Sequence, residues 1–429
     1  MKKPKIQSPT GMHDILPEDQ KYFQKIYQII EEIADFYHFQ KIDTPILEDT
    51  ELFTKGIGLA TDIVQKEMFS FRTKGKDNLT LRPEGTAPVA RAYIQYGMQN
   101  WPQPVKLWYF GPFFRYERPQ LGRFRQFWQF GFEVLGEASP VIDVQIIQIF
   151  YNILKELKLK NLIIEVNSIG DSFCRSYYKK LLVNYSNSRL NSFCPNCRKR
   201  LKTNPLRILD CKEEKCKRTI SQAPQVLDYL CENCHKHFKN VLEFLDDLEL
   251  PYRLNPYLVR GLDYYTKTVF EIFNEEKTDS EEMPRNALAG GGRYDNLTKM
   301  LGGKSTPATG GAVGIERIVA LMKEKAVKFS KEKSVQVFLA QLGDLAKRKS
   351  LKLIEDFRAA KILTAESLGR DSLKSQLKIA DKLGARYTLI LGQKEALDEV
   401  VIIRDMKNGS QETIKLEKAA VEVKKRLAK

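Results

Sequence analysis

A chain of 429 residues is too long for one hydrophobic core, which indicates two or three domains. Its composition, 42% hydrophobic and 29% charged, is that of an ordinary soluble globular protein. No apolar run is long enough for a secretion signal or a bilayer span, so we expect a cytoplasmic protein without a membrane partner. Lysine and arginine exceed the acidic residues by 70 − 54 = 16, and this excess favours polyanionic partners, although a solubilising lysine-rich surface would give the same balance.

Three regions differ in their sequence patterns. Residues 1–325 mix helical patterns with aromatic, glycine-bearing strands. Inside this region, residues 175–250 are helical, charged and hold most of the cysteines, so we interpret them as an insertion. Residues 326–334 have no apolar face and are typical of a linker. Residues 335–429 follow as a separate small domain.

The stretch FFRYERPQLGRFRQFWQFGFEVLG (113–136) predicts a hairpin with its turn at PQLG, residues 119–122. Side chains alternate between the two faces of a strand. One face of the second arm therefore carries Arg125, Phe127, Gln129, Gly131 and Glu133, and the other carries Trp128, Phe130, Phe132 and Val134. The apolar face is expected to pack on helices. The polar face favours ligand binding over simple solvation, because a solvated face would more naturally carry Lys, Glu and Thr.

Seven cysteines occur, Cys174 and six more between Cys194 and Cys234. Paired CxxC units in a cytosolic chain favour a metal over disulfides. The pairs Cys194–Cys197 and Cys231–Cys234 predict one closed tetrahedral zinc site of four thiolates, with a structural role. An insertion with reduced thiols and no zinc is the alternative.

Two further parts of the larger region place glycines or charged residues beside strands. YLVRGLDYYTKTVFEIF (257–273) is strand-like and carries its polar residues in its first half. LAGGGRYDNLTKMLGG and GGAVGIERIVALM place glycines before a basic residue and a helix, which allows close approach of a flat or phosphorylated ligand. Neither matches the P-loop or the dinucleotide fingerprint, so a nucleotide site here would need another architecture.

Strands and helices alternate in residues 335–429, which predicts a parallel α/β sheet. Asn408-Gly409 adds a hairpin at its end. With 20 basic and 13 acidic residues, this domain carries 7 of the excess positive charges.

Several of these segments together resemble the histidyl-tRNA synthetases, which are class II aminoacyl-tRNA synthetases, and the resemblance covers essentially the whole chain. TPILEDTELF (44–53) is similar to class II motif 1, the arginine-rich stretch 113–136 to motif 2, and GGAVGIERIVALM to motif 3. LVRGLDYYTKTVFE and AGGGRYDNL resemble segments specific to the histidine enzymes, and LRPEGTAPVARAY (81–93) resembles a substrate-binding segment.

The resemblance implies an α+β fold: an antiparallel catalytic sheet flanked by helices, interrupted by the helical insertion and followed by an α/β anticodon-binding domain. It implies that histidine and ATP give histidyl-adenylate and diphosphate, and that the histidyl group then passes to the 3′ end of tRNA(His). Motif 1 implies a homodimer.

Negative charge builds on the phosphate oxygens when a carboxylate attacks the α-phosphorus, so fixed positive charge is the main requirement. Arginine meets it with a permanent charge and a planar fork of donors. By resemblance, Arg115 and Arg260 are the catalytic residues at the α-phosphate, Arg123 and Arg317 bind the γ-phosphate, and Glu117 positions adenine. Mg²⁺ is expected on the outer phosphates.

The histidine pocket needs a carboxylate for the ammonium group and partners for both imidazole nitrogens. By resemblance it consists of Glu84, Gly85, Thr86, Gln129, Glu133, Arg260, Tyr264 and Tyr265. Arg118 and Gln120 are candidates for contacts with the acceptor end of tRNA.

Two other functions remain open. One is the synthetase-like regulatory subunit of ATP phosphoribosyltransferase, which keeps the catalytic fold but usually lacks the anticodon domain. The other is a class II synthetase for glycine, threonine or proline. The C-terminal domain and the histidine-specific segments favour the histidine enzyme.

Overall fold

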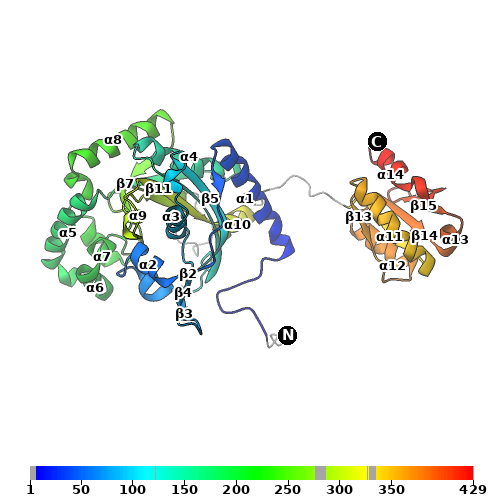
Figure 1. Ribbon diagram of the computed structural model, residues 1–429, viewed down its shortest axis with the longest axis horizontal. Coiled ribbons are helices and arrows are strands. Elements are labelled where there is room, and N and C mark those ends of the chain that lie inside the picture. The colour runs from blue at the N-terminus through cyan, green and yellow to red at the C-terminus, as the bar shows by residue number, and fades with distance from the viewer. Residues whose placement is uncertain (1–5, 121, 276–286, 326, 328–334, 429) are drawn as a thin grey trace. The chain divides into compact units, whose positions relative to one another are not determined.

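The computed structural model describes residues 6–120, 122–275, 287–325, 327 and 335–428 (Figure 1). The chain forms two compact units, residues 1–327 and residues 328–429. Most of the predicted linker, residues 326 and 328–334, lies outside the described residues. Within the described part of the chain, no helix is both long and apolar enough to cross a membrane.

The larger unit is built on an eight-stranded sheet with the order β1-β5-β6-β11-β10-β9-β7-β8. In that order the strands are Gln40–Lys41, Val105–Phe114, Gln126–Leu135, Ala308–Gly314, Ala289–Arg293, Thr266–Asn274, Leu162–Ser168 and Tyr252–Leu254. The six central strands pair antiparallel, as predicted. The short edge strands β1 and β8 instead pair parallel with β5 and β7.

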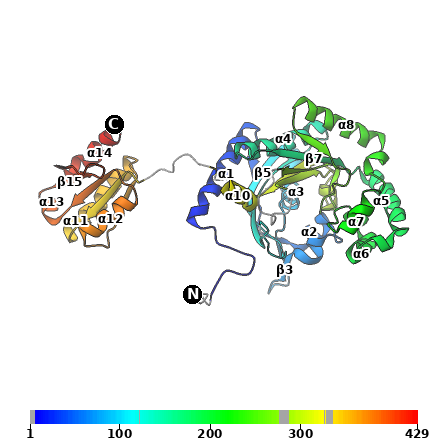
Figure 2. The ribbon, with the colours of Figure 1, turned by 180° about the vertical axis from the view of Figure 1, so that it is seen from behind.

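One face of this sheet is aromatic and is covered by α1 (Pro17–Phe36), α4 (Pro140–Glu156) and α10 (Ile315–Glu324), as Figures 1 and 2 show. Phe132 and Phe270 of the sheet lie 5.8 and 6.1 Å from the ring of Phe150 on α4. Trp128 lies 6.0 Å from Phe23 on α1. The predicted packing of the apolar face of β6 against helices is therefore confirmed.

The opposite face is bordered by smaller elements. A three-stranded sheet, β2-β4-β3, lies beside α2, α3 and α9. These elements are β2 (Leu47–Asp49), β3 (Phe69–Arg72), β4 (Asn78–Leu81), α2 (Thr50–Ile57), α3 (Thr86–Gln95) and α9 (Leu297–Met300), with short helical turns at Ile63–Glu67 and Met98–Asn100.

The insertion between β7 and β8 is helical, as predicted, and its helices gather at one side of the larger unit (Figures 1 and 2). They are α5 (Ser172–Asn187), α6 (Pro195–Thr203), α7 (Glu214–Ile220) and α8 (Glu232–Asp247), with short turns at Leu190–Ser192, Pro205–Ile208 and Val226–Tyr229. Their core joins Tyr178, Phe193 and Ile220 with three buried cysteines.

The smaller unit holds a five-stranded sheet with the order β13-β12-β14-β15-β16. Its elements are β12 (Val337–Gln341), α11 (Asp344–Ala359), β13 (Thr364–Glu366), α12 (Leu373–Lys382), β14 (Tyr387–Leu391), α13 (Gln393–Leu397), β15 (Val400–Asp405), β16 (Gln411–Lys415), a turn at Leu416–Lys418 and α14 (Ala419–Leu427). The first three strands are parallel, and β15 and β16 form the predicted hairpin, with Gly409 at φ 77°.

The hairpin predicted over residues 113–136 is correct in its second arm and wrong in its first. The first arm is β5, which ends at Phe114 opposite Gln126. Residues 115–120 and 122–125 lie in a loop that is closed by a hydrogen bond from Arg115 N to Arg125 O. Pro119 cannot donate to a strand ladder, and salt bridges from Glu117 to Arg115 and Arg123 stabilise the loop instead.

A buried charge network connects the sheet to α4 and the insertion. Arg293 at the end of β10 is fully buried, and its Nη2 lies 2.7 Å from the Oδ1 atom of Asp143 on α4. His237 of α8 places Nε2 2.8 Å from the Oδ2 atom of the same carboxylate. Burial alone would raise the pKa of Asp143, but the Arg293 charge and the His237 contact hold it below its usual value.

We expect Arg293→Ala to destabilise the larger unit by about 3–5 kcal/mol, because it leaves the Asp143 carboxylate buried without its main partner. Urea unfolding followed by tryptophan fluorescence measures this loss, since Trp101, Trp108 and Trp128 all lie in that unit. Lys239→Ala is the control. It removes an exposed salt bridge with Glu243 on α8 and should lower the free energy of unfolding by less than about 0.5 kcal/mol. Equal effects of the two variants would contradict the argument.

Candidate active site

A row of residues runs across the open face of the large sheet, and its middle is nearly bare of side chains. The pairing register places Tyr109, Gly131, Ala312, Gly290, Glu271, Glu165 and Arg253 opposite one another on β5, β6, β11, β10, β9, β7 and β8. Paired residues point to the same face of a sheet. Glycine and alanine in the centre therefore leave room for a ligand to lie on the backbone, with polar groups at both ends.

Close packing around Tyr109 explains two of these glycines. A Cβ atom at Gly85 would lie 2.3 Å from the Tyr109 ring, and one at Gly131 would lie 2.4 Å from it. Such distances are far below van der Waals contact, so any side chain at either position would displace the ring. The Tyr109 ring therefore packs between Gly85, at the N-cap of α3, and Gly131 in the row.

Two buried carboxylates lie at this end of the cavity. Glu84 accepts hydrogen bonds of 2.8 Å from the backbone N atoms of Thr86 and Ala87, at the N-terminus of α3. Glu133 accepts a hydrogen bond of 2.7 Å from the Thr86 hydroxyl and one of 2.5 Å from the Tyr294 hydroxyl. Thr86 therefore joins both carboxylates into one polar cluster.

The two carboxyls are too deeply buried to ionise as they do in water. Burial raises the pKa of Glu133 to about 8, against hydrogen bonds from Tyr294 and Thr86 that lower it. Burial also raises the pKa of Glu84, while the backbone donors of α3 oppose the rise. Two carboxyl groups with raised pKa values in one cavity are typical of a functional site, and they suit a cationic ligand.

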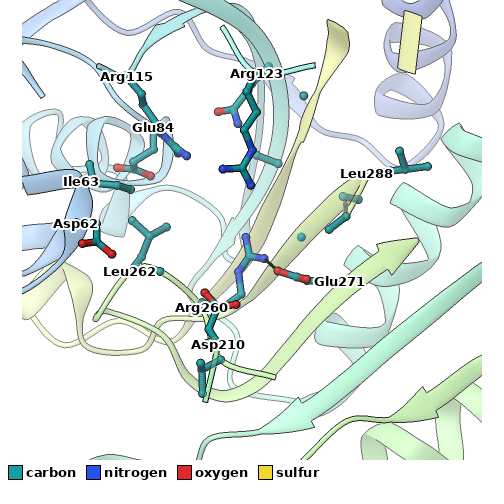
Figure 3. Close-up of a pocket in the computed structure, with 18 of the residues that line it drawn as sticks. Asp62, Ile63, Glu84, Arg115, Arg123, Asp210, Arg260, Leu262, Glu271 and Leu288 are labelled. Atoms are coloured by element: carbon teal, nitrogen blue, oxygen red, sulfur yellow. Dashed lines mark hydrogen bonds and ion pairs between the residues drawn. The ribbon is translucent and has the colours of Figure 1, made fainter. Parts of the chain in front are cut away.

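Four arginines line the same cavity, and one of them, Arg115, lies beside Glu84. Arg115 and Arg123 come from the loop after β5, Arg260 precedes β9, and Arg317 lies on α10. Figure 3 shows Arg115, Arg123 and Arg260 directed into a common space. Burial, followed by the charge of Arg123, lowers the pKa of Arg317 to about 10, which is the expected response of cations gathered without an equivalent of anions.

Each arginine is held by protein acceptors. Arg115 Nε donates to Pro83 O at 2.9 Å, and Arg317 Nη1 donates to Ala287 O at 2.7 Å. Arg123 pairs with Glu117 at 3.2 Å. Arg260 pairs with Glu271, and a Cβ atom at Gly290 would lie only 2.4 Å from its guanidinium. These contacts fix the guanidinium groups before any ligand binds.

The cavity has a volume of about 620 Å³ and brings together most of the predicted site residues. Its lining includes Glu84, Gly85, Thr86, Arg115, Glu117, Arg123, Gln129, Arg260, Tyr264, Tyr265 and Arg317. Glu133 lies just beneath the lining, bonded to Thr86. Arg118 and Gln120 do not line the cavity and are exposed on the loop after β5.

Several lining residues were not predicted. Tyr109 and Glu271 belong to the bare row. Asp62, at the start of the turn Ile63–Glu67, and Arg207 and Asp210 of the insertion also line the cavity. A lone glutamate inside the apolar strand TVFEIF was an available signal for Glu271. No local pattern distinguishes Arg207, whose place depends on its 3.1 Å ion pair with Asp62.

The predicted zinc site made of both CxxC pairs is wrong as a single site. Cys194 and Cys197 cluster with Cys211 and Cys216, whereas Cys231 and Cys234 cluster with Cys174 and Asp171. The pair Cys194–Cys197 lies at the N-terminus of α6, and the pair Cys231–Cys234 lies at the N-terminus of α8. The spacing of cysteines along the sequence does not indicate which helix ends lie close together in space.

Comparison with known proteins gives a consistent result. The family model for histidyl-tRNA synthetase matches residues 11–174 and 196–318, and that for an anticodon binding domain matches residues 336–426. A histidine–tRNA ligase of Caldicellulosiruptor saccharolyticus is 45% identical over 424 residues, covering 99% of this chain and 100% of that protein. One from Dehalococcoides mccartyi is 44% identical, covering 98% of this chain and all of its own length.

Solved structures agree with these matches. Apo histidyl-tRNA synthetase of S. aureus superposes with a TM-score of 0.80 at 36% identity, covering 98% of this chain and 100% of that one. A Bacillus halodurans structure described as an ATP phosphoribosyltransferase regulatory subunit/histidyl-tRNA synthetase gives a TM-score of 0.62 at 20% identity, covering 91% and 98% of the two chains. At that identity the second likeness shows the fold alone.

The raised pKa of Glu133 predicts a dependence of stability on pH. With a pKa of about 8 in the folded protein and 4.5 as its ordinary value, the folded state holds an extra proton between these pH values. The resulting stabilisation is complete below about pH 4.5 and is lost as the pH rises through 8. Between pH 5 and pH 8 the wild type loses this stabilisation and Glu133→Gln does not. The free energy of unfolding of the variant, measured relative to the wild type, should therefore rise by up to about 4 kcal/mol over this range.

Urea unfolding at both pH values measures this difference. Glu243→Gln, at an exposed position of α8, is the matched control and should show no such trend. A Glu133→Gln difference that does not change with pH would contradict a neutral carboxyl at this position.

Proposed function

This chain belongs to the histidyl-tRNA synthetase family, and from that premise we propose how its cavity binds histidine and ATP and joins them. The chain is a histidine–tRNA ligase, a class II aminoacyl-tRNA synthetase. Histidine binds near Glu84 and Glu133, and ATP with its Mg²⁺ binds against the four arginines. The observation that carries the proposal is the convergence of Arg115, Arg123, Arg260 and Arg317 on one cavity with the two buried carboxylates.

The amino acid is recognised by charge and by hydrogen bonds. Its ammonium group lies against the carboxylates of Glu84 and Glu133, and Thr86 keeps both acceptors in place. Gln129, Tyr264 and Tyr265 line the same space and offer partners for the imidazole nitrogens and the remaining polar atoms. A pocket whose buried polar groups would otherwise lose partners rejects analogues strongly.

In the first step, an oxygen of the histidine carboxylate attacks the α-phosphorus of ATP, the bond to the bridging oxygen breaks, and diphosphate leaves. Arg115 and Arg260 face the α-phosphate and stabilise the charge that grows on its free oxygens. Arg123 and Arg317 hold the γ-phosphate, so that the triphosphate folds back, and Glu117 positions adenine. Positive charge that is fixed in advance lowers the barrier without reorganisation during the reaction.

In the second step, the terminal hydroxyl of tRNA(His) attacks the histidyl carbonyl, and AMP leaves. Arg118 and Gln120 lie exposed on the loop after β5, where an acceptor end entering the cavity would pass. The smaller unit, which matches the anticodon-binding family, would bind the other end of the tRNA. Its positive charge suits a polyanion.

Three further properties belong to the same proposal. A homodimer is supported by the motif 1 resemblance of residues 44–53 and by the exposure of Ile46 and Leu47 there. We expect the enzyme in the cytoplasm, where protein synthesis supplies its substrates. Any zinc bound by the insertion is structural, because none of the cysteines lines the cavity.

Exchange of diphosphate into ATP tests the substrate assignment. We expect exchange with histidine and none with glycine, threonine or proline, followed by histidylation of tRNA(His). A regulatory subunit would bind histidine without exchange, and a related synthetase would prefer another amino acid. Either result would overturn the proposal.

Arg260→Ala should lower the histidine-dependent exchange rate by about 10²–10³-fold, because it removes a fixed cation from the reacting phosphate. The loss is expected mainly in kcat, with a smaller change in the KM for histidine. Arg189→Ala removes an exposed arginine of the insertion that contacts only the Tyr185 region, and it should retain wild-type exchange. Comparable losses in both variants would refute the role of Arg260.

A further inference from the structure

All seven cysteines of the sequence lie in two compact clusters of the insertion. The four-cysteine cluster consists of Cys194, Cys197, Cys211 and Cys216. The Asp-Cys₃ cluster consists of Asp171, Cys174, Cys231 and Cys234. Within each cluster, the candidate ligand atoms all lie within 4.8 Å of one another, and no cysteine forms a disulfide.

The distances fit a tetrahedral ion better than a set of unrelated thiols. Zinc–sulfur bonds of about 2.3 Å place two sulfurs of a tetrahedron about 3.8 Å apart. The Sγ atoms of Cys194 and Cys211 are 3.9 Å apart. In the other cluster, Cys231 Sγ lies 3.8 Å from Asp171 Oδ2. Thiols without a shared ion have no reason to gather four at a time at this spacing.

Backbone amides already point at the sulfurs. Cys194 N donates to Cys216 Sγ at 3.2 Å, and Cys197 N donates to Cys194 Sγ at 3.4 Å. In the Asp-Cys₃ cluster, Cys231 N donates to Cys174 Sγ at 3.1 Å. Such donors stabilise thiolates and orient metal ligands.

We propose that the insertion binds two zinc ions, one in the four-cysteine cluster and one in the Asp-Cys₃ cluster. Thiolate-rich tetrahedral sets select zinc among the common divalent ions, and closed sets of four protein ligands are structural. The helices concerned are short, α6 with 9 residues and α7 with 7, and bury little apolar surface alone. Metal binding supplies the stability that so small a core lacks.

The two ions secure different parts of the molecule. The four-cysteine cluster has ligands before and after the segment 198–210, whose side chains reach the active-site cavity. Asn204 Nδ2 donates to Asp263 Oδ1 at 2.8 Å, and Arg207 pairs with Asp62 at 3.1 Å. This zinc therefore fixes one wall of the cavity, which Arg207 and Asp210 line.

The Asp-Cys₃ cluster joins the first turns of α5 and α8 directly after β7. Gly170 allows this approach, because its φ is +66° and a Cβ atom there would lie 2.4 Å from Cys174 Cβ. Gly170 O accepts a hydrogen bond of 2.8 Å from Lys267 N. This zinc therefore anchors the insertion to the catalytic sheet.

Metal analysis of the full-length protein, purified without chelators, tests the proposal. We expect two zinc ions per chain. X-ray absorption at the zinc edge should give about 3.5 sulfur ligands per ion, since seven cysteines are shared by two sites. One ion per chain would overturn one site. No metal, or iron in place of zinc, would overturn both.

Single substitutions separate the two sites. Cys211→Ser and Cys231→Ser should each lower the zinc content from two to one. Asp171→Asn can still cap α5, where Asp171 Oδ1 accepts from Cys174 N at 3.0 Å, but should bind zinc weakly, whereas Asp171→Cys should retain two ions. Thr203→Ala, at an exposed position of α6, is the control and should also retain two. If Asp171→Asn still binds two zinc ions per chain with unchanged affinity, Asp171 is not a zinc ligand.

The effect on catalysis rests on the proposed function, whereas the metal content does not. Cys211→Ser should raise the KM for histidine or ATP at least threefold, because it loosens the wall that holds Arg207. A Cys211→Ser protein with one zinc and unchanged KM values would overturn the coupling but leave the two sites intact. If neither the variant nor the wild type catalyses exchange, the zinc contents still decide the proposal.

Discussion

The bare centre of the large sheet is the constraint on which the active site depends. Gly131, Ala312 and Gly290 lie side by side on three neighbouring strands and expose the backbone on one face. The other face of the same strands is aromatic and packs on helices, which keeps the sheet in place without side chains on the open face. Polar groups then stand only at the two ends of the row. The sheet thus separates Tyr109, with Glu133 beside it, from Glu271 and its partner Arg260 nearer the other end of the row.

Burying four arginines near one another is unfavourable unless each has an acceptor. Here the acceptors are two carboxylates, Glu117 and Glu271, and backbone carbonyl groups. They hold the guanidiniums in position without neutralising all of the charge, and burial, together with the nearby charge of Arg123, lowers the pKa of Arg317. A triphosphate bound as proposed would relieve the repulsion among these arginines. The same arrangement would then serve both ATP binding and the stabilisation of charge during the reaction.

Much of this was predictable wherever a local pattern determined the geometry. Alternation along β6 correctly separated Gln129 and Glu133 from Trp128 and Phe130, since a strand has only two faces. The loop that follows β5 at Arg115 was not predicted, because its course depends on ion pairs and on Pro119 rather than on strand propensity. Tyr109 was missed because its role depends on glycines from two other segments. The cysteines were grouped wrongly because spacing along the chain does not specify which helix ends meet in space.

Asp62 is one of the contacts that connect the insertion to the cavity. Its carboxylate lies 3.0 Å from Arg200 and 3.1 Å from Arg207, one on α6 and one on the turn that follows. These arginines keep the pKa of Asp62 below its usual value, although burial opposes them. Movement of α6 would therefore leave a partly buried carboxylate beside the cavity without its partners. With zinc bound as proposed, the four-cysteine cluster at the start of α6 would limit that movement, so the cysteines would contribute to the shape of a site that none of them lines.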